Sequence, residues 1–167
     1  NDGLALEYAS MDLRGDKEVV MAAVAQDGDA LEYASDELKN DEDVVLAAVA
    51  QFQRFDSALE HAGKDMRNNK EIVMAAVAQD GTALEYASAK LKNDEEVVMA
   101  AVAQNGDALE FANERLRNNK DVVLAAVAQN WRALYYASEE LKNDNKVVLA
   151  AVTQNGYALE FAGEHMR

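Results

Sequence analysis

Apolar residues recur along this chain in two alternating blocks. The first block reads Ala-Leu-Glu, or once Ala-Leu-Tyr, and begins at residues 5, 30, 58, 83, 108, 133 and 158. The second block reads VVMAAVAQ or a close variant and begins at residues 19, 44, 72, 97, 122 and 147. Successive copies are 25 residues apart, with one step of 28, so the chain is a tandem repeat of one short structural unit.

The first block predicts an amphipathic helix of about two to three turns. In one copy, Ala30, Leu31, Tyr33, Ala34 and Leu38 share one face when residues are spaced by about 100°. The acidic side chains between them point away from that face. This segment is therefore expected to bury one side and to expose the other.

Capping residues are expected at both ends of each helix. Asp29 and Glu32 have the spacing of a capping box at the start of the first helix. Asp41 is placed to cap the second helix. Glycines follow the second block, where the left-handed conformation would end a helix: Gly28, Gly81, Gly106 and Gly156.

The second block predicts a more deeply buried helix. Residues 44–49 are apolar around nearly the whole circumference, and only the sector with Asp43, Ala47, Ala50 and Gln51 suits water. A β-strand is the alternative on propensity. The alanine pairs, the following glycine and the strict link to a capped helix favour the helix.

Two short helices in every 25 residues can bury their apolar faces only by stacking on their neighbours. The sequence therefore predicts an all-α fold, an α-solenoid of about 6.5 tandem two-helix repeats that forms one domain over residues 1–167. The strings ALEYAS, LKND and VVLAAV resemble the tandem repeats catalogued as domain of unknown function 4116. The resemblance covers nearly the whole chain, implies a helical repeat and supplies no catalytic residue.

Composition narrows the possible partners. The chain carries 31 acidic and 16 basic residues, a net charge of −15, which disfavours direct binding to nucleic acid or to anionic lipid. No apolar run is long enough to insert into a membrane. The absence of cysteine removes disulfides, thiolate zinc sites and a cysteine nucleophile, and it favours an intracellular location.

No group of residues has the pattern of a catalytic, cofactor or metal site. His61 and His165 are separated by four repeats and cannot form a metal pair. Asp41, Glu42 and Asp43 lack the order of a calcium loop and stand where a helix start favours acids. We therefore expect neither enzymatic activity nor a cofactor.

Two polar rows follow the repeat, and each has two interpretations. A glutamine after each second block forms a hydrogen-bonded ladder within the fold or, alternatively, a ladder that binds a peptide; these residues are Gln26, Gln51, Gln79, Gln104, Gln129 and Gln154. Acids near the start of the second helices form a strip for a basic partner segment or only a solvated surface; these are Glu18, Asp43, Glu71, Glu96 and Asp121.

The stretch QNWRALYYAS at 129–138 departs from its counterpart QNGDALEFAN at 104–113. Trp131 replaces a glycine, Arg132 replaces the expected cap, and Tyr135 replaces an outward glutamate. One interpretation is repacking, with Trp131 stapled onto Tyr136. The other is a partner contact, because Trp, Arg and Tyr are enriched at interaction hot spots.

An insertion in QFQRFDSALE, residues 51–60, adds about one helical turn and is expected to extend the preceding helix. Its aromatic residues either bridge a gap between repeats or contact a partner. Near residue 160, the last helix has no second-block helix after it. The candidate partner-contact residues are Phe52, Arg54, Phe55, Trp131, Arg132, Tyr135, Tyr157 and Phe161.

These features predict a non-enzymatic scaffold, a protein–protein interaction module or a peripheral subunit of a larger assembly. Its partner would present a basic or aromatic-accepting surface. Neither end has the polar capping repeat that a free solenoid usually carries, so we expect further chain or another subunit to cover the ends. The alternatives are a regulatory or spacer array attached to a catalytic domain, and an acidic mimic of nucleic acid.

Overall fold

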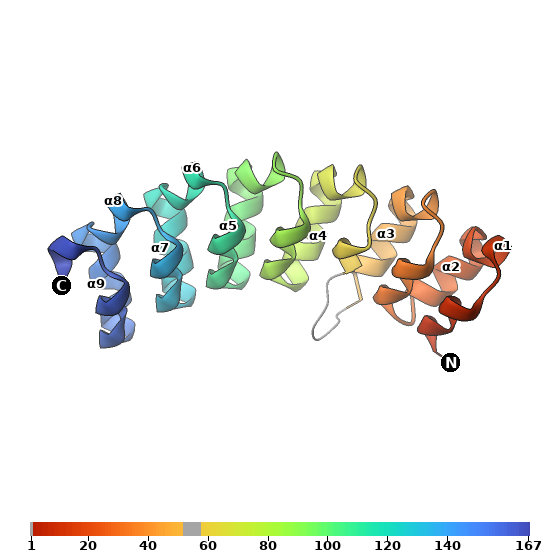
Figure 1. The fold of residues 1–167 in the computed structure, drawn as a ribbon, viewed down its shortest axis with the longest axis horizontal. Coiled ribbons are helices and arrows are strands. Elements are labelled where there is room, and N and C mark those ends of the chain that lie inside the picture. The colour runs from red at the N-terminus through yellow and green to blue at the C-terminus, as the bar shows by residue number, and fades with distance from the viewer. Residues whose placement is uncertain (1, 52–57) are drawn as a thin grey trace.

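The computed structural model of this chain describes residues 2–51 and 58–167. The repeats follow one another in a single, gently curved row, with the two termini at opposite ends (Figure 1). Within the described residues there is no β-strand, and each repeat packs against the next one. The predicted all-α solenoid is therefore confirmed.

Each repeat contains three helical segments rather than two, and among the described residues only the last copy has just the first two of them. The first is a 3₁₀ helix: η1 (Gly3–Tyr8), η2 (Gly28–Tyr33), η4 (Ala58–Glu60), η6 (Gly81–Tyr86), η8 (Gly106–Phe111), η9 (Trp131–Tyr136) and η10 (Gly156–Phe161). The second is a single turn: α1 (Met11–Arg14), η3 (Leu38–Asn40), η5 (Met66–Asn68), η7 (Leu91–Asn93), α6 (Glu114–Arg117), α8 (Glu139–Lys142) and η11 (Glu164–Met166). The third is the Val/Ala helix: α2 (Lys17–Val24), α3 (Glu42–Val49), α4 (Lys70–Gln79), α5 (Glu95–Gln104), α7 (Lys120–Gln129) and α9 (Asn145–Gln154).

The prediction of one amphipathic helix of two to three turns was wrong, because that helix is broken in the middle. Ala34 adopts an extended conformation, with ψ of 157°, directly after η2. Ser35 then caps the next turn, since its Oγ accepts a hydrogen bond from the Leu38 N–H at 3.4 Å. Serine and asparagine side chains compete for backbone groups in this way and so break helices.

The predicted capping box of Asp29 and Glu32 was also wrong. The cap is Asp27, whose carboxylate accepts a hydrogen bond from the Asp29 N–H at 3.0 Å. Asn105 caps η8 in the same way, through the Asp107 N–H at 3.0 Å. The 3₁₀ helix begins at the glycine, so the capping residue stands one position before it.

The regular spacing of the glycines has a steric origin. No described glycine has a positive φ, so the left-handed conformation expected after the second block was wrong. Instead, a Cβ atom on Gly81 would lie 2.3 Å from the Ala101 carbonyl oxygen, and one on Gly106 would lie 2.4 Å from that of Ala126. At these positions glycine therefore lets the 3₁₀ helix approach the backbone of the Val/Ala helix that follows it.

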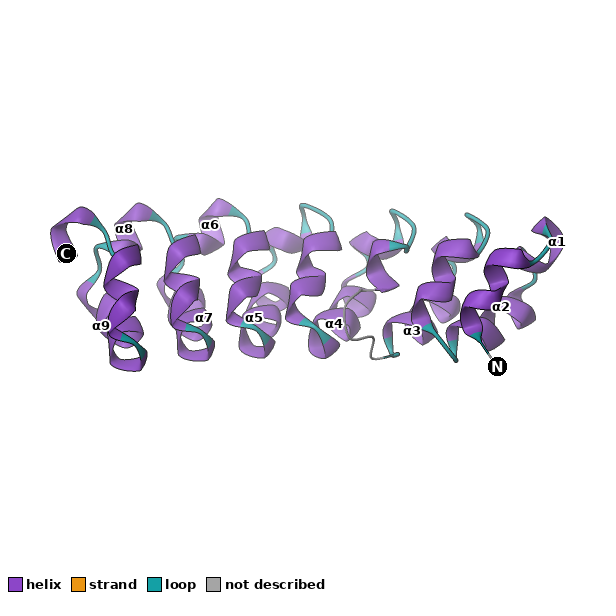
Figure 2. Cartoon of the chain, turned by 60° about the horizontal axis from the view of Figure 1, so that its bottom comes forward, coloured by secondary structure: helices purple, strands orange, loops and turns teal. Residues whose placement is uncertain are grey.

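The Val/Ala helices form one row along the solenoid, and they are seen side by side in Figure 2. The prediction of nearly all-round burial is confirmed: Val44, Val45, Ala48 and Val49 are buried in α3. The extension of α3 by a turn was wrong, because this helix ends at Val49.

A backbone hydrogen bond crosses every junction between repeats. The N–H group that follows the extended alanine donates to a carbonyl oxygen in the single turn of the preceding repeat, at 2.7–3.0 Å. The donor and acceptor pairs are Ser35 and Arg14, Gly63 and Lys39, Ser88 and Arg67, Asn113 and Lys92, Ser138 and Arg117, and Gly163 and Lys142. The break in the first block is therefore what frees an N–H group to link one repeat to the next.

Three lysines add an ion pair at alternate junctions. Each stands first in its Val/Ala helix and reaches the aspartate that caps the next one. The nitrogen–oxygen distances are 2.8 Å for Lys17 and Asp41, 2.9 Å for Lys70 and Asp94, and 2.6 Å for Lys120 and Asp144. The hydrogen bond from Lys70 holds the pKa of Asp94 below its usual value.

This pair gives the stability a dependence on acid. Because the pKa of Asp94 is lower in the folded than in the unfolded chain, the stabilisation is complete above about pH 4. It is lost as the pH falls further, through the folded pKa. We expect Asp94→Asn to remove a small part of the acid sensitivity, less than about 1 kcal/mol because the pair is at the surface. Urea unfolding of both proteins between pH 6 and pH 2.5 measures the difference.

Asparagine is a suitable replacement because it keeps the cap. Asn69 and Asn119 occupy the same repeat position, and each accepts a hydrogen bond from the N–H group two residues later at 3.0 Å. Parallel pH profiles for the wild type and the variant would show that the ion pair contributes nothing.

Candidate functional site

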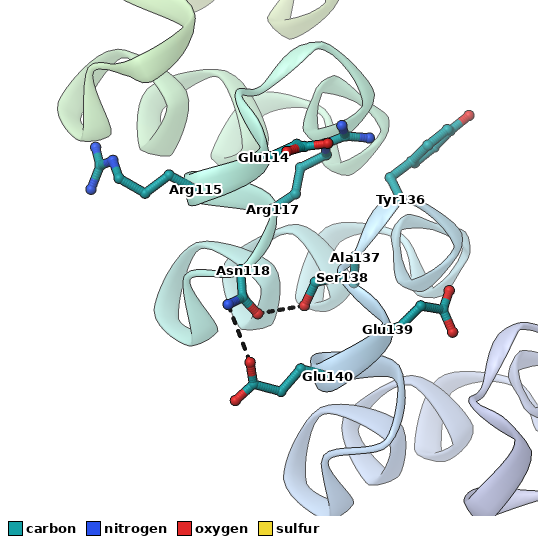
Figure 3. A pocket seen from close by; sticks show the side chains of 9 residues that line it. All are labelled: Glu114, Arg115, Arg117, Asn118, Tyr136, Ala137, Ser138, Glu139 and Glu140. Atoms are coloured by element: carbon teal, nitrogen blue, oxygen red, sulfur yellow. Dashed lines mark hydrogen bonds between the residues drawn. The ribbon is translucent and has the colours of Figure 1, made fainter.

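A groove of about 530 Å³ lies between α6 and α8 (Figure 3). Its wall combines the Arg117 side chain, the Tyr136 ring and the extended backbone of Ala137 and Ser138. The remaining lining residues are Glu114, Arg115, Asn118, Glu139 and Glu140. At the first junction, the equivalent residues Arg14, Tyr33, Ala34 and Ser35 line a second groove of about 360 Å³. The groove therefore follows from the geometry of the repeat.

Most polar groups of the groove between α6 and α8 bind other groups of the protein. Asn118 accepts a hydrogen bond from Ser138 and donates one to Glu140 at 3.2 Å, as Figure 3 shows. Arg115 donates to the side-chain and backbone oxygens of Asn93, each at 2.9 Å. These contacts tie neighbouring repeats together.

Tyr136 lines this groove and is also one of four aromatic rings that contact one another near the C-terminal end. Burial and, to a smaller extent, the Glu110 carboxylate raise the pKa of Tyr136. Its ring lies edge-on to that of Tyr135, with centroids 5.3 Å apart. We call Trp131, Tyr135, Tyr136 and Phe161 the C-terminal aromatic cluster.

The C-terminal aromatic cluster joins the last two repeats. Trp131 in η9 stacks on Phe161 in η10, with centroids 5.7 Å apart and an interplanar angle of 21°. Tyr135 approaches the same Phe161 ring edge-on at 5.5 Å. Both geometries are favourable for aromatic pairs. Phe161 thus forms the centre of the contact.

Trp131 is the first residue of η9 and Asn130 is its cap, so the expected staple of Trp131 on Tyr136 was wrong. The indole occupies the place of the repeat glycine and packs against the next repeat instead. The Arg132 guanidinium lies 4.5 Å from the centroid of the Trp131 ring, a cation–π contact. Trp131 is half-buried, whereas Arg132 is exposed.

The large exposed apolar side chains of the described residues lie only near the two ends of the row. At the N-terminal end they are Leu4, Tyr8, Met11 and Leu13, and at the C-terminal end they are Tyr135 (59% exposed), Leu149 (67%), Tyr157 (69%) and Leu159 (42%). Between residues 14 and 134, outside 52–57, no large apolar side chain is exposed to this degree. The two ends of the stack are therefore the candidate interaction sites.

Sequence reasoning found Tyr135 and Tyr157 but missed the exposed leucines. Leu159 occupies a repeat position that is fully buried at Leu31, Leu84 and Leu109, so its residue type gives no sign of exposure. Only the position of Leu159 in the last copy of the repeat indicates that it is exposed. Phe161, another sequence candidate, is half-buried within the aromatic cluster.

The insertion candidates Phe52, Arg54 and Phe55 lie outside the described residues. In the described part of the chain, no group of three or more His, Asp or Glu side chains could hold a metal ion. Across residues 2–51 and 58–167, no helix combines the length and the apolar character needed to cross a bilayer.

Two glutamines link adjacent repeats, in agreement with the structural interpretation of that row. Gln104 accepts a hydrogen bond from the Gly81 N–H at 2.7 Å and donates to the Gln79 carbonyl at 3.0 Å. Gln154 donates to the Ala128 carbonyl at 3.2 Å.

The acidic row is partly neutralised within the stack. Asp43 lies 2.9 Å from the Lys17 ammonium, and Glu96 lies 2.7 Å from that of Lys70. These two carboxylates already have a cationic partner in the preceding repeat, which weakens their attraction for an external basic segment.

A comparison with protein families finds one match, and it repeats along the chain. The family described as Domain of unknown function (DUF4116) matches residues 1–39, 16–54, 41–92, 73–117, 94–142 and 119–167. The matched segments overlap, and together they span the whole chain. Neither the curated proteins nor the solved structures gave a match.

Proposed function

Because this chain belongs to the DUF4116 family, whose description assigns no activity, we propose a function from its surfaces: a non-enzymatic helical-repeat module that binds a protein partner through the ends of its stack. The observation that supports this is the confinement of the large exposed apolar side chains of the described residues to the two ends. Contiguous apolar surface on a soluble protein marks interaction sites.

The C-terminal end has the composition of an interaction hot spot. Tyr135 and Tyr157 are well exposed. Arg132 is also exposed, and it lies in η9, the same helix as Tyr135. Tyrosine and arginine, together with tryptophan, dominate measured hot spots. The exposed Tyr135 ring is also held in place by Tyr136 and Phe161, so little side-chain entropy is lost when a partner binds it.

Net charge restricts the nature of the partner. A chain with a net charge of −15 attracts basic proteins and repels acidic ones. The partner surface is therefore apolar at its centre and neutral or basic around it. Rim charges of this kind act mainly on the rate of association and its dependence on salt.

Substitution at the C-terminal end tests the proposal once the protein that copurifies with the chain has been identified. We expect Leu149→Asp and Tyr157→Ala each to weaken binding of that protein by about tenfold or more, the size of a moderate hot-spot effect. Thermal unfolding should change little, because both side chains are mainly exposed. Isothermal titration calorimetry and a thermal melt on the same samples measure both quantities.

Ala103→Asp is the matched control for Leu149→Asp. Ala103 is exposed in α5, in the middle of the row, so the substitution adds the same charge far from either end. If Ala103→Asp weakens binding as much as Leu149→Asp, the partner lies along the row and the proposal of end binding is wrong.

A further inference from the structure

Arg117, in the groove between α6 and α8, differs from two other arginines at the same repeat position. The Nε–H group of Arg14 donates to the Ala9 carbonyl oxygen at 3.1 Å, and that of Arg167 donates to the Ala162 carbonyl oxygen at 2.8 Å. The Arg117 Nε atom is buried and has no hydrogen-bond partner. An unpaired buried donor is costly, so an acceptor supplied by a ligand would be favourable here.

The positive charge of Arg117 also lacks a partner within the described part of the chain. Arg117 takes part in none of the ion pairs found there. Arg115, in the same turn, already donates to both oxygens of Asn93. In Figure 3 the Arg117 side chain extends from α6 toward the side of the groove where Tyr136 stands. Because no hydrogen bond holds the Arg117 guanidinium, it can turn toward a ligand without breaking one.

The glutamates that line the groove restrict the kind of ligand. Glu139 lies 2.9 Å from the Lys142 ammonium, and Glu140 accepts a hydrogen bond from Asn118. Glu114 forms no ion pair with the residues that the structure describes. A small free anion is repelled by these carboxylates and by the net charge of −15. A ligand that carries a carboxylate beside a cation is not.

We propose that this groove binds a segment of another protein in which an acidic residue stands next to a basic one. The acidic side chain accepts two parallel hydrogen bonds from the Arg117 guanidinium, the geometry that suits a carboxylate best. The basic side chain approaches Glu114, and the rest of the segment lies against Tyr136 and Ala137. The site lies between the fifth and sixth repeats, away from the ends of the stack, and so goes beyond the proposed function.

The groove at the first junction provides a comparison within the same molecule. It is smaller, about 360 Å³ against about 530 Å³. Its arginine, Arg14, already donates to the carbonyl oxygens of Ala9 and Glu7. The edge of the guanidinium that would bind a carboxylate is therefore occupied, and this groove should not bind the segment.

The probe is a capped synthetic hexapeptide, Ala-Ala-Glu-Lys-Ala-Ala, added to the whole chain and followed by NMR. We expect the Nε–H signal of Arg117 to shift in a saturable way while that of Arg14 does not. The backbone amides of Ala137 and Ser138 should shift with the same binding curve, and they also report on variants that lack the arginine.

Arg117→Lys should weaken this binding at least about tenfold, because an ammonium does not form the two parallel hydrogen bonds. Lysine occupies the same repeat position at Lys39, Lys92 and Lys142, so the variant should fold normally. Glutamine in place of the peptide glutamate should have a similar effect. Glu114→Gln should weaken binding of the original peptide but not of one with alanine in place of its lysine, as a double-mutant cycle measures.

Absence of a saturable shift at Arg117, or equal binding by Arg117→Lys or by the glutamine peptide, overturns the inference. An equal effect of sodium acetate at the same concentration also overturns it, since the site would then take any small carboxylic acid. Leu149→Asp should leave peptide binding unchanged. If the peptide does not bind but Leu149→Asp still weakens binding of the copurifying protein, this inference fails and the proposed function does not.

Discussion

Gly106→Ala should lower the free energy of unfolding by roughly 1–3 kcal/mol, the cost of overpacking a tightly packed interior. The added methyl group would lie 2.4 Å from the Ala126 carbonyl oxygen and 3.1 Å from the Asn130 backbone nitrogen. Both atoms belong to the backbone, so no side-chain rotation relieves the contact. The η8 segment and α7 must move apart, and this opens the surface that they bury together.

Gly156→Ala is the matched control for Gly106→Ala. It makes the same chemical change at the same repeat position, but the new methyl group meets nothing within 4 Å. We expect this variant to be unchanged or stabilised by up to about 1 kcal/mol, because alanine reduces the entropy of the unfolded chain. Urea unfolding measures both variants, and equal destabilisation would show that the glycines serve something other than close approach.

Leu109→Ala should lower the free energy of unfolding still further, by roughly 2–5 kcal/mol. Leu109 is completely buried in η8, which contacts both the preceding α5 and the following α7, so its removal leaves a cavity that neighbouring helices cannot easily fill. Leu159→Ala at the same repeat position should cost less than about 1.5 kcal/mol, because Leu159 is already 42% exposed. Urea unfolding of the two variants measures how much a following Val/Ala helix contributes to the free energy of unfolding.

Similar losses in the two leucine variants would contradict this account. In that case, the Val/Ala helix that follows would add little, and the burial of the 3₁₀ helix would come from its own residues and from the preceding repeat. A loss at Leu159 larger than that at Leu109 would also mean that the C-terminal surface is covered in solution.

The sequence predicted the stacking correctly, because the hydrophobic period alone decides it. The Val/Ala blocks are apolar on most sides, and only neighbouring repeats can cover them. Their caps were also readable: Asp94 accepts hydrogen bonds from the Glu96 and Val97 N–H groups at 3.1 and 3.2 Å. A capping aspartate before an apolar helix is a local signal that tertiary contacts do not override.

The sequence misled where a residue type serves two different purposes. Glycine after a helix usually indicates a left-handed turn, but Gly81 is required by the nearness of Ala101 in the following helix. That constraint comes from a residue twenty positions later and appears only when the repeat is folded. Ser35 likewise lies within the span of the predicted amphipathic helix, although its side chain caps a new turn.

The candidate interaction residues include both internal packing residues and surface residues, and the sequence does not separate the two kinds. Trp131 breaks the repeat because its ring stacks on Phe161 of the next repeat. Tyr135 breaks it on the exposed side, 59% open to solvent. One run of substitutions thus contains an internal packing residue and a surface residue, and the spacing along the sequence does not distinguish them. Contact of Trp131, Arg132, Tyr135 and their neighbours with a partner stays a prediction.

Native-state hydrogen exchange tests most directly whether each repeat is stable because its neighbours cover it. Stability in such an array falls from its middle toward its ends, since terminal repeats have one neighbour in place of two. The amides of Val98 in α5 and Val123 in α7 should therefore exchange only through global unfolding, whereas those of α2 and α9 should exchange faster through local opening. Equal protection of all Val/Ala helices, or the strongest protection in α9, would contradict the account.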